Sequence, residues 1–159
     1  MDKEKMQQFA ARISQANRTE LTVIVFELAI FHLEEGLKAD SQQDKVSLAE
    51  NIKKSMMYVN QLCGALDYSQ KISADLFSLY RYVNGILAHA MAARNVENLD
   101  EAKGILEGLK ESFAEVAKTD NSAPLMSNTQ QLYAGLTYGK GTLNEVCINS
   151  NEANRGYKV

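Results

Sequence analysis

Few residues of this 159-residue chain have the type and spacing that chemistry would need. His32 and His89 could bind iron inside a helical bundle if a glutamate stood three residues before each, because di-iron bundles use Glu-x-x-His pairs. Position 29 is alanine and position 86 is isoleucine, so neither histidine has the required partner. Cys63 and Cys147 are far apart in the sequence, and we expect both to be reduced thiols.

One stretch, GKGT at residues 139–142, shares some features with a phosphate-binding loop. The full pattern requires glycine at 134 and serine or threonine at 141, where this chain has alanine and glycine. The sequence also offers no nucleophile with a neighbouring base. We therefore predict no catalytic residue, no metal and no cofactor, and we expect that the protein is not an enzyme.

Charge and hydropathy exclude two further classes of partner. The formal net charge is −3 with both signs mixed, which does not favour binding to nucleic acid. The most apolar stretch, residues 21–33, would span only about 20 Å as a helix, too short to cross a bilayer. The first residues lack the apolar core of a signal peptide, so we expect a cytoplasmic protein with no membrane insertion.

The spacing of apolar residues predicts five helices within residues 1–118. The first and shortest covers about 2–14, and four long ones cover about 18–39, 42–67, 73–95 and 99–118. Asn17 with Glu20 and Asn98 with Glu101 are expected capping boxes, and Ser41 is an expected N-cap. Because the connections are short, we predict an all-α fold, an antiparallel up-and-down four-helix bundle with a short N-terminal helix.

Two helices carry apolar residues alternately three and four apart, which predicts the line along which each packs on its neighbours. In the helix over 42–67 these residues are Val46, Ala49, Ile52, Met56, Val59, Cys63 and Leu66. In the helix over 73–95 they are Ile72, Leu76, Leu79, Val83, Ile86 and Ala90.

Residues 119–159 differ from the rest of the chain. They are rich in Asn, Gly, Ser and Thr and show no sustained periodicity, which predicts a mostly irregular C-terminal extension following a domain over 1–118. One interpretation is a flexible extension. The other is a segment that docks on the bundle through its apolar and aromatic residues Leu132, Tyr133, Leu136 and Tyr138 and occupies a binding groove.

The helix over 18–39 is apolar nearly all the way round, since ten of the thirteen residues from 21 to 33 are apolar. A surface helix normally keeps a polar side. Leu21, Ile24, Val25, Leu28 and residues 31–33 are expected to fill the bundle core, while Val23, Phe26, Ile30 and Leu37 lie on a second side. That second side must be covered by the N-terminal helix, the C-terminal extension, a second copy of the chain or a partner.

Two stretches resemble the flagellar secretion chaperones of the FliS family. ANRTELTVIVFELAIFHL, residues 16–33, is similar to the family's ASPEELTLMLYDGAIRFL. ALDYSQKISADLFSLYRYVNGIL, residues 65–87, is similar to the family's SLDxE…ISENLxxLYDYM…L. The resemblance covers about residues 5–118.

The resemblance implies a cytoplasmic export chaperone. Such a protein binds the disordered C-terminal segment of flagellin, prevents premature polymerisation and assists delivery to the flagellar export apparatus. A segment that folds on binding needs a large apolar contact to offset its ordering entropy, which would explain the apolar helix. The alternative is a helical homodimer or a protein-interaction module with another client. With a client as partner, we expect a monomer or a weak homodimer.

The same reasoning predicts which residues would contact the client. Phe9 and Ile13 would form an N-terminal flap over a groove. The walls of that groove would be Val23, Phe26, Ile30, Met57, Tyr58 and Tyr80.

Overall fold

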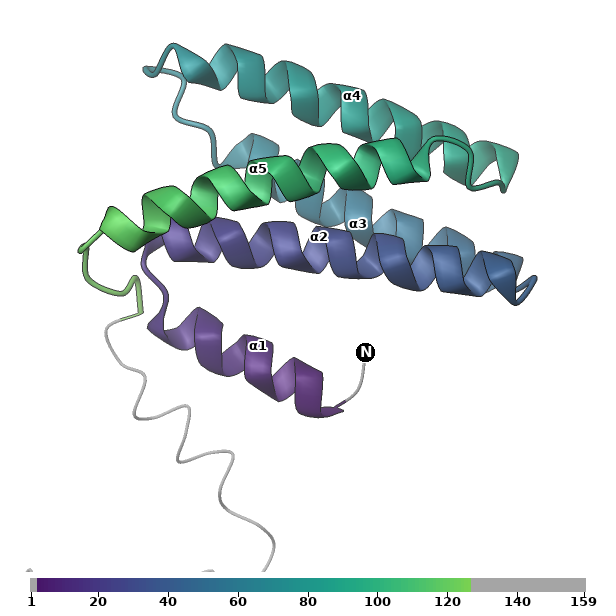
Figure 1. The fold of residues 1–159 in the computed structure, drawn as a ribbon, viewed down its shortest axis with the longest axis horizontal. Helices are drawn as coiled ribbons and strands as arrows, with labels where there is room; N and C mark the ends of the chain where they lie inside the picture. The colour runs from purple at the N-terminus through teal and green to yellow at the C-terminus, as the bar shows by residue number, and fades with distance from the viewer. Residues whose placement is uncertain (1–2, 127–159) are drawn as a thin grey trace, which may run out of the picture. The chain divides into compact units, whose positions relative to one another are not determined.

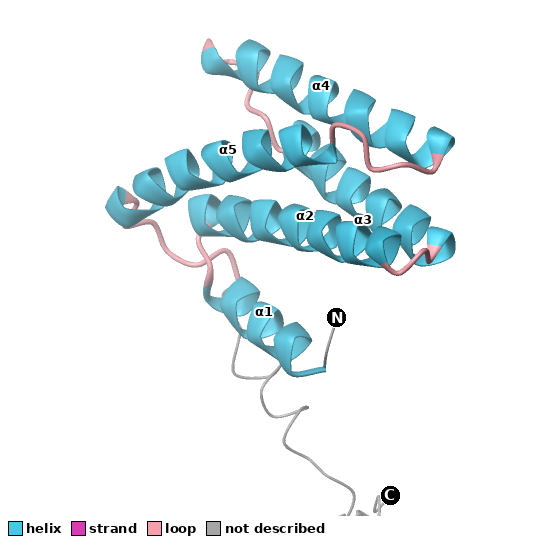
Figure 2. Ribbon diagram, turned by 45° about the vertical axis from the view of Figure 1, so that its right-hand side comes forward, coloured by secondary structure: helices cyan, strands magenta, loops and turns pink. Residues whose placement is uncertain are grey.

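The computed structural model describes residues 3–126, and these residues form five α-helices joined by short connections (Figure 1). Their bounds are α1 Lys3–Gln15, α2 Arg18–Ser41, α3 Lys45–Gly64, α4 Ile72–Ala93 and α5 Leu99–Thr119. Each bound lies within about three residues of the expectation, and the helical bundle is confirmed. Figure 2 shows only helix and loop in the described part of the chain.

The helices α2 to α5 run in alternating directions, so that consecutive helices are antiparallel (Figure 1). The central helix is α2, which packs against α3, α5 and also α1. The fourth helix of the bundle, α4, packs on α3 and more sparsely on α5. The two views agree that α4 and α5 diverge away from the loop that joins them (Figures 1 and 2).

The helix ends confirm one of the three predicted caps. Asn17 and Glu20 form the predicted capping box: the Asn17 side chain accepts from the Glu20 N–H at 2.8 Å, and the Asn17 N–H donates to the Glu20 carboxylate at 2.9 Å. The prediction for Ser41 is wrong. Because α2 continues to Ser41, that hydroxyl donates back to the Lys38 carbonyl, and the Asp44 side chain caps α3 instead.

The predicted capping box at Asn98 is also wrong. Asn98 adopts the left-handed conformation, with φ of 63°, and its side chain makes no capping hydrogen bond. An N-cap side chain reaches the first turn of its helix from an extended backbone, which Asn98 does not have.

The predicted packing lines of α3 and α4 are confirmed in part. Several predicted residues pack in or against the main core: Ile52, Met56, Val59 and Cys63 on α3, Leu66 just after it, and Leu76, Val83, Ile86 and Ala90 on α4. Val46 and Ile72 are 72% and 62% exposed, and Leu79 is also exposed. The buried residues are Leu48, Ile52, Ser55, Val59 and Leu62 on α3 and Ser73, Leu76, Tyr80, Val83, Leu87 and Ala90 on α4. Both helices carry more apolar residues than one packing line needs, so spacing alone does not select the line.

A small polar residue lies on the side of α3 that packs against α2. Ser55 is fully buried, and its hydroxyl donates to the Ala29 carbonyl of α2 at 3.0 Å. Because Ser55 and Ala29 are both small, the backbones of α2 and α3 approach closely there. A search for large apolar residues does not find such a position.

The two sides of α2 differ in part from the prediction. Phe26 and Ile30, which we expected on the second side, belong to the main core shared with α3, α4 and α5, whereas Leu33 lies in that core as predicted. Ile24 and Leu28, which we expected in that core, belong to a second and smaller cluster beside α1. The helix is apolar on several sides because three other helices cover it.

Part of the C-terminal extension is described. After α5, residues 120–126 run without regular structure past the connection between α1 and α2 (Figure 1). Leu132, Tyr133, Leu136 and Tyr138, predicted to dock on the bundle, lie outside the described residues, as does Cys147. The domain boundary at residues 118–119 stays a prediction.

Candidate functional site

The second apolar cluster lies where α1 covers α2 and α3. Its buried members are Ala16, Ile24 and Leu28, and half-buried side chains surround them: Phe9, Ile13, Leu21 and Tyr58. We call these seven residues the α1 cluster. The bundle supplies Leu21, Ile24, Leu28 and Tyr58, while Phe9 and Ile13 of α1 cover them from outside.

Few contacts hold α1 on the bundle. Ser14 is the buried residue of this helix, and Phe9 and Ile13 are half-buried. Outside the cluster, the Arg12 guanidinium binds the Glu27 carboxylate of α2 through both nitrogens, with Nη2 and Oε1 2.9 Å apart. The hydrogen bond with Glu27 raises the pKa of Arg12. Because this ion pair is exposed, it contributes little to stability, on the order of 1 kcal/mol or less.

Cation–π contacts add to this attachment. The Lys5 ammonium lies 4.1 Å from the centre of the Phe31 ring, and Phe31 is buried on α2. Such contacts at exposed sites are worth about 0.5–1 kcal/mol. Together, one apolar cluster, one exposed ion pair and one cation–π contact attach thirteen residues of helix.

The floor beneath α1 contains a buried histidine. The His32 ring stacks on Tyr58 of α3, with centroids 5.8 Å apart and an interplanar angle of 10°. His32 Nδ1 lies 2.9 Å from Asn51 Oδ1, and burial lowers the pKa of His32. Tyr58 touches both the main core and the α1 cluster, so this stack links the two.

A surface pocket of about 420 Å³ opens beside the α1 cluster, between α1, α2 and α5. Val23, Ala114 and Ala117 are among its apolar lining residues, while Arg12, Glu20 and Lys118 add charges of both signs. A pocket of this size has room for one or two large apolar side chains of a bound peptide.

Three of the residues predicted to contact a client lie together. Phe9, Ile13 and Tyr58 are all members of the α1 cluster. Val23 lines the neighbouring pocket. Met57 is 47% exposed, but it is not a member of the α1 cluster.

The other three predicted residues lie in the interior. Phe26, Ile30 and Tyr80 are 0%, 7% and 1% exposed and form part of the main core. The Phe26 ring packs between Tyr80 and Phe113, with centroid distances of 6.1 and 5.4 Å. In this conformation they do not line a groove, and a role in client contact would require the bundle to open.

Sequence reasoning did not predict Leu21, Ile24 and Leu28 as residues that would contact a client. They are spaced three and four apart, with Phe31 as the next member of the series, so they form one stripe along α2. The spacing was visible in the sequence. What it could not show was which of the two apolar stripes of α2 faces α1.

The described side chains offer hydrophobic contact and little reactive chemistry. Within residues 3–126, no three His, Cys, Asp or Glu side chains are grouped as a metal site would need. Burial raises the pKa of the Cys63 thiol, which lowers its nucleophilicity at neutral pH. Burial also raises the pKa of Tyr80 to about 12, as expected for a core phenol.

No helix in the described part of the chain is long and apolar enough to span a membrane.

This arrangement is typical of helical proteins that bind another helix, because a terminal helix and the bundle share an apolar cluster that a partner helix could also fill. The family model described as Flagellar protein FliS matches residues 1–120 of the 159-residue chain. The chain therefore belongs to the FliS family of flagellar secretion chaperones, which is not a family of enzymes. A search of curated proteins found no match.

Proposed function

We propose that this protein binds the disordered C-terminal segment of flagellin, keeps it from polymerising early and assists its export. Membership of the FliS family supports this proposal, since the family implies flagellin as the client. The observation that carries it is the α1 cluster, in which a lightly attached helix covers an apolar face of the bundle.

The client would occupy the face that α1 covers. Leu21, Ile24, Leu28 and Tyr58 present apolar surface from two helices, and an amphipathic client helix would bury it as α1 does. Displacing α1 costs its own contacts, so the client must supply a larger contact than Phe9 and Ile13 do. A long segment that folds on binding can do this, because it buries about 1,000–3,000 Å².

The predicted contact residues then take different roles. Phe9 and Ile13 form the flap and compete with the client. Tyr58 contacts the client directly, Val23 receives it in the pocket between α1, α2 and α5, and Met57 meets a segment that extends past the α1 cluster. Phe26, Ile30 and Tyr80 support the face from the core.

The remaining parts of the proposal follow from the family. The protein would act in the cytoplasm, as a monomer or weak homodimer, and would deliver its client to the flagellar export apparatus. It would need no cofactor for this, because binding and release are changes in apolar burial.

Two substitutions with opposite expected effects test the proposal. Tyr58→Ala should weaken binding of the flagellin segment about tenfold or more, since burial of a large side chain contributes roughly 1.5–3 kcal/mol. Phe9→Ala should strengthen binding several-fold, because it weakens the competing flap. Affinity is measured by fluorescence anisotropy of a labelled flagellin segment, with helix content checked by circular dichroism.

Tyr68→Ala is the matched control, since Tyr68 is 67% exposed and outside the α1 cluster. It should leave the affinity unchanged. General loss of structure would weaken binding in both test variants, so a gain with Phe9→Ala cannot arise from unfolding. Unchanged affinity in both variants would show that the client does not use the α1 cluster.

A further inference from the structure

The chain after α5 makes a set of hydrogen bonds with the connection between α1 and α2. Figures 1 and 2 both show this segment passing that connection. The Leu125 N–H donates to the Ala16 carbonyl at 3.0 Å, and the Asn17 side-chain amide donates to the Asp120 carbonyl at 3.1 Å. We call residues 120–125 the strap.

Asp120 is the most connected residue of the strap. One carboxylate oxygen accepts from the Thr19 hydroxyl at 2.5 Å, and the other accepts from the Ser122 N–H at 3.0 Å. The same side chain therefore shapes the turn that begins the strap and binds the first turn of α2. Hydrogen bonds from Ser122 and Thr19 lower the pKa of Asp120, so the carboxylate is ionised at neutral pH.

The strap binds the hinge of α1. Ala16 and Asn17 are the only residues between the end of α1 at Gln15 and the start of α2 at Arg18. Both are buried, at 3% and 4% exposure. Any swing of α1 away from α2 must change backbone dihedral angles at or near these two residues.

The Asn17 side chain makes hydrogen bonds both to the start of α2 and to the residue that follows α5. Its Oδ1 caps α2 by accepting from the Glu20 N–H, and its Nδ2 donates to the carbonyl of Asp120 directly after α5. The side chain therefore fixes the start of α2 relative to the strap. With the Ala16 carbonyl also held by Leu125, both hinge residues are restrained.

We propose that the strap is a latch on the α1 hinge, so that breaking its hydrogen bonds lets α1 leave the bundle more readily. Only one consequence of this inference rests on the proposed function: an α1 that is held less firmly would compete less with flagellin. The latch itself is a property of the free protein. Binding events or modifications that pull on the chain after residue 126 would act on α1 through the strap.

Native-state hydrogen exchange of the full chain, without flagellin, tests the latch. Thr19→Val removes one strap hydrogen bond with little change of shape, and Asp120→Ala removes that bond together with the one to Ser122. Because the strap is then held by fewer hydrogen bonds, we expect exchange in α1 to rise about three- to tenfold while exchange in α4 stays unchanged. Asp75→Ala, at an exposed position of α4, is the control and should change neither.

Two results would overturn the latch. Unchanged exchange in α1 for both variants would show that the strap does not restrain the hinge. An equal rise in α1 and α4 would show that the strap contributes to the stability of the whole bundle and does not act on α1. Because this experiment contains no flagellin, neither result bears on the proposed function, which is tested separately by the binding measurements above.

Discussion

The protonation state of His32 follows from its neighbours. The Asn51 amide donates to the Ser47 carbonyl at 2.9 Å, which turns Asn51 Oδ1 toward His32 Nδ1 at 2.9 Å. An amide oxygen can only accept a hydrogen bond, so the neutral imidazole of His32 carries its proton on Nδ1. Burial is the main cause that lowers the pKa of His32, and the charge of Lys54 acts in the same direction.

The lowered pKa of His32 makes the stability of the fold depend on pH. The unfolded chain binds a proton below the ordinary histidine pKa of about 6.5, whereas folded His32 resists protonation. The contribution of His32 is thus complete above that value and is lost as the pH falls below it. We expect a lower free energy of unfolding at pH 5.5 than at pH 7.5, measured by urea denaturation.

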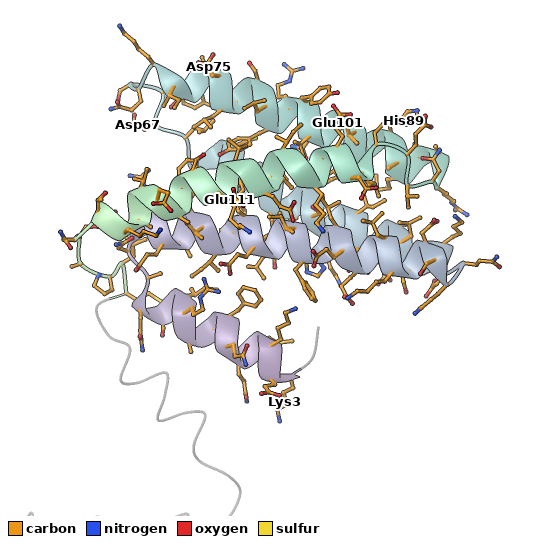
Figure 3. All side chains as sticks on the ribbon, in the orientation of Figure 1. Lys3, Asp67, Asp75, His89, Glu101 and Glu111 are labelled. Carbon is orange, nitrogen blue, oxygen red and sulfur yellow. The ribbon has the colours of Figure 1, made fainter. Side chains whose placement is uncertain are left out.

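Two variants isolate this effect. His32→Gln keeps a donor for Asn51 but cannot titrate, so the difference in unfolding free energy between the two pH values should shrink. His89→Gln is the matched control, because His89 lies exposed near the end of α4 (Figure 3). An equal pH dependence in the wild type and His32→Gln would contradict the role given to His32.

At the scale of the helices, the sequence predicted the number of elements, their bounds within a few residues and the cap at Asn17. Apolar periodicity and capping are local signals, so they can be read without knowledge of the fold. The packing lines of α3 and α4 were predicted only in part. Val46 and Ile72 fit the periodicity as well as Leu48 and Tyr80 do, and only the neighbouring helices decide between them.

The candidate site could also be predicted only in part. Phe9, Ile13 and Tyr58 were predicted to contact a client, and they lie together in the α1 cluster. Phe26 and Ile30 were expected on a second side of α2 and Ile24 and Leu28 in the bundle core, whereas Phe26 and Ile30 lie in the main core and Ile24 and Leu28 are buried in the α1 cluster. A helix with two apolar stripes and hardly any polar side carries no signal of which stripe faces inward.

The start of α3 gives a direct test at this scale. Asp44 accepts from the backbone N–H groups of Val46 and Ser47, at 3.2 and 3.0 Å, whereas the Ser41 hydroxyl donates to a carbonyl within α2. Asp44→Ala should therefore lower the free energy of unfolding measurably, and Ser41→Ala should have almost no effect. Chemical denaturation measures both. Equal losses in the two variants would contradict the observed position of the cap.

At the scale of the whole described chain, residues 3–126 form a bundle built around α2. Three helices cover α2, and they do so unequally: α3 and α5 through the main core, and α1 through a small cluster, an exposed ion pair and a cation–π contact. The apolar character of α2 on nearly every side is therefore satisfied in the free protein. In the proposed function, the same side that α1 covers is available to a client.

Apolar side chains are also exposed away from α1. Ile72, Leu79 and Tyr82 of α4 are 62%, 39% and 51% exposed, and α4 diverges from α5 along its length. A client segment longer than one helix could extend over this surface after filling the α1 cluster. The total apolar burial on binding, which sets the heat-capacity change, would then exceed what the α1 cluster alone provides.

Calorimetric titration of the full chain with the C-terminal segment of flagellin from the same organism, repeated at several temperatures, tests the central claim most directly. We predict saturable binding near one to one with a clearly negative heat-capacity change, as expected when a folding segment buries apolar surface. The absence of saturable binding would contradict the claim that this protein is a flagellin chaperone. Binding without a negative heat-capacity change would contradict the claim that the client is held by apolar burial on the face covered by α1.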